Sequence, residues 1–299
     1  MVSLNLAVTQ FELRPERDLD QFLAHTEDLV RRAARQDAEV VLFPELSSTG
    51  LLGSITGHEV TTATIKSDYW DVLPTFTDGI VDGLRSMAKN HGIVIVGGSH
   101  NRLHSDGSLR NTAFVAHPDG RVESQDKIHL TPQEHALGTR GGDELLVTRI
   151  GPFTAGVLIC ADIQFPELSR HLVRQGVDLI LCPSLTWNRR GVHRVRTGCQ
   201  ARAIENQLYV AMSPLIGHNG LPANAPMYAT GNALVTTPVD RTVGINDGFL
   251  ATVESSEEEL VVAALDHDLL MASRAKPEAP GLALQRPDLY AKLQAQTGA

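Results

Sequence analysis

Short apolar runs alternate with segments of helical periodicity along most of the chain. After Asp18, which can cap a helix, apolar residues recur near a period of 3.6 up to about residue 35. The same period predicts further helices at 79–90, 167–175, 192–206 and 288–296. Apolar runs with flanking turn residues predict strands at 5–10, 39–43, 93–97, 153–159, 177–182, 208–212, 231–235 and 259–264.

Two hairpins are predicted in the middle of the chain. The first joins 112–116 to 121–123 through Pro118-Asp119-Gly120, and the second joins 144–150 to 153–159 around Gly151-Pro152. The segments 46–72 and 127–142 have weak periodicity, so we expect loops there, the first with one helical turn. Buried strands, hairpins and outer helices together predict an α/β fold with two mixed sheets packed between helices.

Composition narrows the class of protein. The 299 residues contain 42% hydrophobic and 20% charged residues, which predicts one globular domain over 1–299, with 270–299 as a C-terminal tail. The net charge is −9 and no basic run occurs, so we expect no nucleic-acid partner. No signal peptide pattern and no run of about 18 apolar residues are found, so we expect no membrane association.

The three cysteines are Cys160, Cys182 and Cys199. An odd number without metal-type spacing argues against a disulfide framework and predicts a reducing, cytoplasmic location. Twelve histidines are present, but the i, i+4 pair His100 and His104 falls in a predicted loop without cysteine or aspartate at ligand spacing. We therefore expect neither a metal site nor a cofactor.

Three titratable side chains stand immediately after predicted strands. They are Glu45, Lys127 and Cys160. Judged singly, each has an ordinary structural interpretation as a surface acid, a solvated base or a small buried thiol. Together they suit covalent acyl transfer: a thiol attacks the amide carbon, a carboxylate accepts and returns its proton, and an ammonium stabilises the oxyanion. Cys182 and Cys199 lack such neighbours and are interpreted as packing residues.

The motifs around these residues resemble the nitrilase superfamily of carbon–nitrogen hydrolases, from residue 4 to about 268. The resemblance rests on Phe43-Pro44-Glu45, Lys127-Ile128-His129-Leu130, Cys160-Ala161-Asp162 and Phe165-Pro166-Glu167 in that order, with Asn111-Thr112-Ala113 and 200–206 as further matches. It implies a four-layer αββα sandwich. It also implies a homodimer or larger homo-oligomer, formed through the helices expected at 167–175 and 192–206.

The resemblance assigns roles to the site residues. Glu45 is expected to be the general base, Lys127 the oxyanion stabiliser and Cys160 the nucleophile. The backbone N–H of Ala161 is the expected second oxyanion donor. Superfamily members often carry a second glutamate that positions the lysine and the substrate, and Glu134 matches it better than Glu144 does.

Two positions depart from the superfamily pattern. Ala161 stands where tyrosine is common, and Gln164 stands where arginine is common. The stretch from Cys160 to Arg170 and the segment at Gly231 most resemble a subgroup often found fused to N-acetyltransferase domains. Trp187, in the loop after the strand 177–182, is a candidate for lining the substrate pocket, with ordinary packing as the alternative.

We therefore expect an amidase that cleaves a small linear, non-peptide amide through a cysteine thioester. The resemblance also admits N-carbamoyl amides and nitriles as substrates. An acyltransferase would use the same thioester with another acceptor. A catalytically idle protein of this fold that binds a partner is the alternative from a different class, and it is suggested by Ala161 and Gln164.

Overall fold

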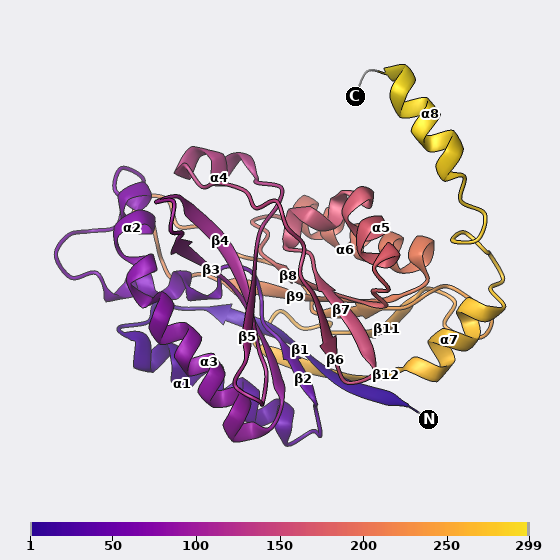
Figure 1. Cartoon of the computed structure of the whole chain (residues 1–299). Helices are drawn as coiled ribbons and strands as arrows, with labels where there is room; N and C mark the ends of the chain where they lie inside the picture. The colour runs from indigo at the N-terminus through magenta and orange to yellow at the C-terminus, as the bar shows by residue number, and fades with distance from the viewer. Residues whose placement is uncertain (1, 298–299) are drawn as a thin grey trace.

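The computed structural model describes residues 2–297 and contains two mixed β-sheets (Figure 1). In the first sheet, β1, β2 and β3 are parallel, while β4 and β5 extend it antiparallel on one side and β12 on the other. Its strands are β1 (Ser3–Leu13), β2 (Val40–Leu42), β3 (Val94–Leu103), β4 (Leu109–Ala116), β5 (Val122–Asp126) and β12 (Glu259–Asp266).

The second sheet has β7, β8 and β9 as its parallel centre, with β6 antiparallel at one edge and β10 followed by β11 at the other. Its strands are β6 (Val147–Ile150), β7 (Phe153–Val157), β8 (Leu179–Ser184), β9 (Tyr209–Gly217), β10 (Leu234–Thr236) and β11 (Phe249–Thr252). The sheets are joined because the end of β1, at Phe11–Leu13, pairs in parallel with Leu215–Gly217 of β9.

Helices cover the outer faces of the two sheets (Figure 1). Helices α1 (Leu19–Ala34) and α3 (Thr77–His91) pack on the first sheet, while α5 (Pro166–Arg174) and α6 (Arg189–Asn206) lie on the side of the second. Strand β1 shows why two cores form: Leu4, Leu6 and Val8 face one, and the intervening Ala7 faces the α1–α3 core. The predicted sandwich of mixed sheets between helices is confirmed.

Several predicted boundaries were wrong. The segment 46–72 contains the 3₁₀ helix η1 (Ser47–Ser54) and helix α2 (Ile65–Asp71), and η2 (Leu73–Phe76) follows it. The strand expected from 144 begins at Val147 and the one expected to end at 97 continues to Leu103. The antiparallel pairing of β3 with β4 stabilises these extra residues, and the pairing shifts register between Val96 and Ser99. Strand β11 and helix α7 (His267–Ala275) were not predicted.

The segment 127–142 is also not a plain loop, because it contains α4 (Pro132–Leu137). Thr131 caps this helix, its side chain accepting from the N–H of Glu134 while the Glu134 side chain accepts from the N–H of Thr131. This Thr-x-x-Glu capping box, with proline at the first helical position, is readable in the sequence. It places Glu134 in the first turn of a short helix.

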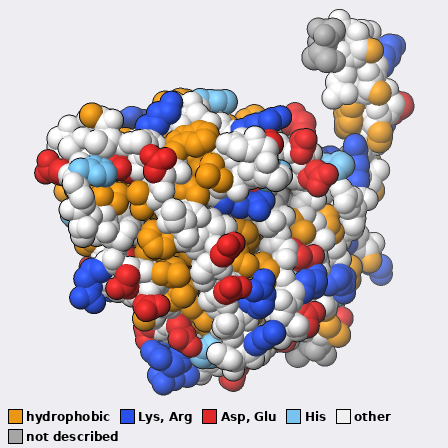
Figure 2. Space-filling model, turned by 60° about the vertical axis from the view of Figure 1, so that its left-hand side comes forward, with side chains coloured by type: hydrophobic (Ala, Val, Ile, Leu, Met, Phe, Trp, Pro, Cys, Tyr) orange, Lys and Arg blue, Asp and Glu red, His pale blue; other side chains and the backbone are white. Residues whose placement is uncertain are grey.

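The chain after residue 270 is helical in two parts. The predicted tail begins inside α7, where Leu270 and Ser273 are buried. After a connecting segment, α8 (Pro287–Thr297) stands away from the body of the molecule (Figures 1 and 2) and exposes Leu289 and Leu293. Among residues 2–297, no helix combines the length and apolar character that crossing a membrane requires.

Candidate active site

Glu45 lies three residues beyond the end of β2 and is held by the neighbouring strand β3. A side chain at Gly98, whose φ is +69°, would collide with the carbonyl oxygen of Pro44, so only glycine permits this close approach. The N–H of Leu46 donates to Ser99 Oγ at 3.0 Å. These contacts hold the Glu45 carboxylate inside the molecule, where it is 3% exposed.

Lys127 follows β5 and lies between two carboxylates. Its Nζ donates to Glu45 Oε1 at 2.6 Å and to Glu134 Oε2 at 2.7 Å, and the residue is 1% exposed. An ammonium has three N–H donors, so these two bonds leave one for a further partner. The capping box of α4 orients Glu134, because its Oε2 also accepts from the N–H and Oγ1 of Thr131.

Asn111, on β4, links the same two carboxylates. Its Nδ2 lies 2.9 Å from Glu45 Oε1 and 2.8 Å from Glu134 Oε1. Sequence reasoning noted Asn111 only as part of a motif and did not assign it to the site. The signal that could have found it is strand pairing: β4 is adjacent to β5, and the N–H of Lys127 donates to Asn111 O at 2.8 Å.

Cys160 begins η3 (Cys160–Gln164), the 3₁₀ turn that leads into α5. Its φ is +48°, a left-handed conformation that is uncommon for a residue with a side chain and is often found at functional sites. The thiol lies 3.3 Å from Leu185 O and 3.5 Å from Ser184 Oγ. Leu185 also donates its N–H to Glu45 Oε2 at 3.0 Å. The backbone of this one residue therefore contacts both the thiol and the carboxylate.

Asp162 fixes the turn to the loop that follows Lys127. Its carboxylate is fully buried and accepts from the N–H of Ile128 at 3.2 Å and of His129 at 2.7 Å. This link joins the turn that carries Cys160 to the backbone that follows Lys127. The structure therefore brings Glu45, Lys127, Glu134 and Cys160 into one buried cluster.

Burial and charge set the proton affinities in this cluster. Burial raises the pKa of Glu45 above its usual 4.5, against the opposing effect of the Lys127 charge. Burial works the same way on Glu134, but Lys127 and the hydrogen bonds from Asn111 and Thr131 outweigh it and lower the pKa. Burial and the Glu45 charge raise the pKa of Cys160, so the resting sulfur is a thiol. Burial disfavours the Lys127 charge, but the surrounding anionic groups raise its pKa overall and keep it an ammonium.

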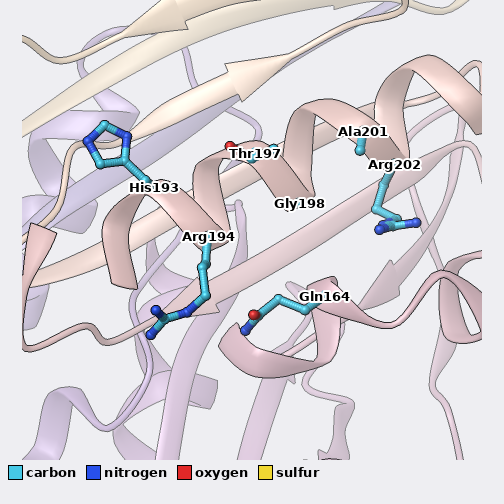
Figure 3. A pocket seen from close by; sticks show the side chains of 7 residues that line it. All are labelled: Gln164, His193, Arg194, Thr197, Gly198, Ala201 and Arg202. Carbon is cyan, nitrogen blue, oxygen red and sulfur yellow. The ribbon is translucent and has the colours of Figure 1, made fainter. Parts of the chain in front are cut away.

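The other predicted site residues lie at different distances from the cluster. Ala161 directly follows Cys160 in η3. Trp187 is two residues beyond Leu185, half-buried and packed against the α1–α3 core. Glu144 is exposed in the segment before β6. Gln164 lines a groove between η3 and α6, so the departure at this position faces the outer surface (Figure 3). No group of three or more metal-binding side chains occurs among residues 2–297.

Comparison with known proteins places the chain in a family. The model of the carbon–nitrogen hydrolase family matches residues 5–275, which is nearly the whole chain. The chain belongs to this family. It is an enzyme that hydrolyses carbon–nitrogen bonds, and the resemblance to the nitrilase superfamily is confirmed.

Relatives of this carbon–nitrogen hydrolase include three well-matched proteins. It is 28% identical over 291 residues to the probable hydrolase YhcX of Bacillus subtilis (strain 168), spanning 96% of this chain and 54% of YhcX. It is 31% identical over 217 residues to the deaminated glutathione amidase of Synechocystis sp. (strain PCC 6803 / GT-S), spanning 68% and 74% of the two chains. A mutant of the Nesterenkonia AN1 amidase from the nitrilase superfamily superposes with a TM-score of 0.70 at 25% identity, covering 91% of this chain and 95% of that one.

Proposed function

We propose that this carbon–nitrogen hydrolase is an amidase that cleaves a small linear amide through a thioester on Cys160. The observation that carries the proposal is the single buried cluster of Glu45, Lys127, Glu134 and Cys160. Relatives with amidase activity in their names support the amide as substrate class. We propose that Glu45 is the base, Lys127 the oxyanion donor and Glu134 the residue that holds Lys127.

In the first half-reaction, the Cys160 sulfur forms a bond to the amide carbon while its proton passes to Glu45. The free N–H of Lys127 and the backbone N–H of Ala161 donate to the oxygen that becomes negative. Collapse of the tetrahedral intermediate breaks the carbon–nitrogen bond, and Glu45 returns the proton to the departing nitrogen. An amine or ammonia leaves, and the acyl group remains on sulfur.

In the second half-reaction, water attacks the thioester carbon and Glu45 accepts the proton from water. The carbon–sulfur bond then breaks, Glu45 reprotonates the sulfur, and a carboxylic acid is released. We propose Trp187 as a wall of the substrate pocket, since it lies two residues beyond Leu185, whose backbone contacts both Glu45 and Cys160. Specificity would come from this loop and from segments 46–72 and 128–142.

A panel of small amides, N-carbamoyl amino acids and nitriles, assayed with the wild type and Cys160→Ala, tests this proposal. We expect the wild type to turn over amides best and the variant to lose at least about 10³-fold, because no other buried group replaces the thioester step. Equal product release by both proteins would rule out the mechanism. Preference for ureido compounds or nitriles would keep the mechanism and change the substrate.

The same panel decides between the remaining alternatives. Hydroxylamine traps the acyl group as a hydroxamate, and a reaction that requires such an acceptor indicates an acyltransferase. The family assignment and the intact set of Glu45, Lys127 and Cys160 argue against the idle binding protein, which would turn over no compound of the panel.

We also propose that the protein forms a homodimer through the face that carries α5 and α6. A groove of about 420 Å³ runs along α6 opposite Gln164 and is lined also by His193, Arg194, Thr197, Gly198, Ala201 and Arg202 (Figure 3). The side chains of Phe165 and Ile204 are 38% and 45% exposed. A partner subunit would cover both the groove and these apolar side chains.

The substitution Ala201→Glu tests the dimer, because a carboxylate in the middle of the groove would be buried without a designed partner. Light scattering at micromolar concentration is expected to give the mass of a dimer for the wild type and a lower mass for the variant. The same exchange at Ala291, on the exposed helix α8, serves as the control and should leave the mass unchanged. A monomeric wild type would contradict the proposal.

A further inference from the structure

The Asn111 side chain is locked in one orientation by the two carboxylates it contacts. Ionised carboxylates only accept hydrogen bonds, so the side-chain group that lies within 2.9 Å of both must be the NH₂ end of the amide. Both of its protons are therefore committed, one to each glutamate. The Oδ1 atom has no hydrogen-bond partner among residues 2–297, although Asn111 is only 1% exposed.

The donors around Glu45 occupy its carboxylate in an ordered way. Oε1 accepts from Lys127 and from Asn111, so both of its lone-pair directions are used. Oε2 accepts from the N–H of Leu185, which leaves one lone pair on this oxygen. The Cys160 thiol lies beside this oxygen, because its sulfur is 3.3 Å from Leu185 O and the N–H of the same Leu185 donates to Oε2.

We propose that Asn111 is a positioning residue that, with Lys127, saturates Oε1 of Glu45 and so restricts proton transfer to the remaining lone pair on Oε2. The same amide holds Glu45 and Glu134 apart at fixed distances on either side of the lysine. This inference rests on the proposed role of Glu45 as the base for Cys160. It adds to that role a defined oxygen atom and a residue that selects it.

The proposal has a consequence for pH dependence. A hydrogen bond donated to a carboxylate favours its ionised form, so removing the Asn111 donor raises the proton affinity of Glu45. Glu45 must be ionised to accept the thiol proton, and the rate of any Cys160 reaction therefore rises as pH increases through the Glu45 pKa. Loss of the donor moves this rise to higher pH. A residue that only stabilised the fold would not move it.

Four titratable groups face Glu45. Lys127 and Glu134 lie on its Oε1 side, and the Cys160 thiol lies near Oε2 through Leu185. The buried hydroxyl of Tyr69, on α2, interacts electrostatically with both glutamates. Asp162 accepts hydrogen bonds from the backbone after Lys127, and its charge and contacts are the same in all of these variants. The Asn111 variants therefore change only the amide that donates to the two glutamates, while the charged residues around Glu45 stay the same.

The test measures the rate at which iodoacetamide alkylates Cys160 as a function of pH in the intact protein, and then kcat/KM for an amide. Asn111→Leu removes both donors at similar volume, and Asn111→Ser leaves room and one hydroxyl donor. We expect the rise of the alkylation rate to move upward by about half a pH unit or more in Asn111→Leu, and by less in Asn111→Ser. At a fixed pH below the midpoint, an upward shift of the midpoint by half a pH unit makes the alkylation of Cys160 about 3-fold slower.

The matched control is Thr112→Val in the next position of β4. Thr112 Oγ1 donates to Asp126 at 2.6 Å and accepts from Arg102 Nε at 2.9 Å; both hydrogen bonds are partly buried, and neither involves a glutamate. It should lower the midpoint of unfolding and leave the pH midpoint unchanged. Glu45→Gln assigns the transition, because its alkylation rate should no longer rise in that pH range.

The outcomes separate this inference from the proposed function. Three outcomes would each overturn the role of Asn111. The pH midpoint could stay unchanged in both folded Asn111 variants, or it could shift by the same amount in Thr112→Val. The transition could also persist in Glu45→Gln. Because alkylation needs no substrate, a wild type that hydrolyses no amide would refute the proposed function and leave this measurement intact. Alkylation of the other two cysteines is measured in Cys160→Ala and subtracted. This background should be small, because Cys182 and Cys199 are fully buried.

Discussion

Replacement of Lys127 by methionine is expected to lower both the activity and the stability of the enzyme by large amounts. Lys127 is the proposed oxyanion donor, and loss of one such donor typically raises the activation free energy by about 2.7–4 kcal/mol. The substitution also leaves Glu45 and Glu134 buried together without the positive charge between them. Removing one partner of a buried pair typically costs about 3–5 kcal/mol of folding free energy.

A double variant distinguishes the two effects. Adding Glu134→Gln to Lys127→Met removes one of the two unpaired carboxylates, so urea unfolding should recover part of the lost stability while kcat/KM for the amide stays low. Lys292→Met, on the exposed helix α8, should change neither quantity. A single Lys127 variant with nearly wild-type activity would contradict the role of the lysine, whatever its stability.

The fold was predictable because its signals are local and periodic. The apolar strand at 39–43 and the helix after Asp18 follow from single segments, and both occur in the structure. Strand β11 escaped prediction because Phe249–Thr252 is short and its strand character comes from pairing with β10. Helix α7 was missed, although Asp266 is its N-cap, because its nine residues bury only Leu270 and Ser273, too few positions to show a helical period.

The site was predictable only in part. Glu45, Lys127 and Cys160 stand at strand exits, so their chemical types and positions already indicated that they could meet. Asn111 and Leu185 gave no such signal, because an amide inside a strand and a backbone group after a strand are ordinary features. Their importance depends on distances across the sheets, such as the 3.0 Å from Leu185 N to Glu45 Oε2, and these are fixed only in the folded chain.

The second large effect is expected from Glu45→Gln. Glutamine keeps the shape of the side chain but cannot accept the thiol proton, so kcat/KM should fall by about 10²–10⁴. Its amide group would also place N–H protons near one of the donors that now face the carboxylate. We therefore expect some loss of stability in urea unfolding, smaller than that of Lys127→Met because no buried charge is left without an opposite partner.

The pH profile of the wild type should identify this residue. Burial raises the pKa of Glu45 above 4.5, so kcat/KM should rise with pH through a midpoint above that value, and Glu45→Gln should lack this rise. No fall is expected near pH 9.0, the ordinary thiol value, because the pKa values of Cys160 and Lys127 are both raised. Glu134→Gln is the matched comparison: it removes the other carboxylate on Lys127 and should keep the acid transition. A profile that is the same in wild type and Glu45→Gln would exclude Glu45 as the base.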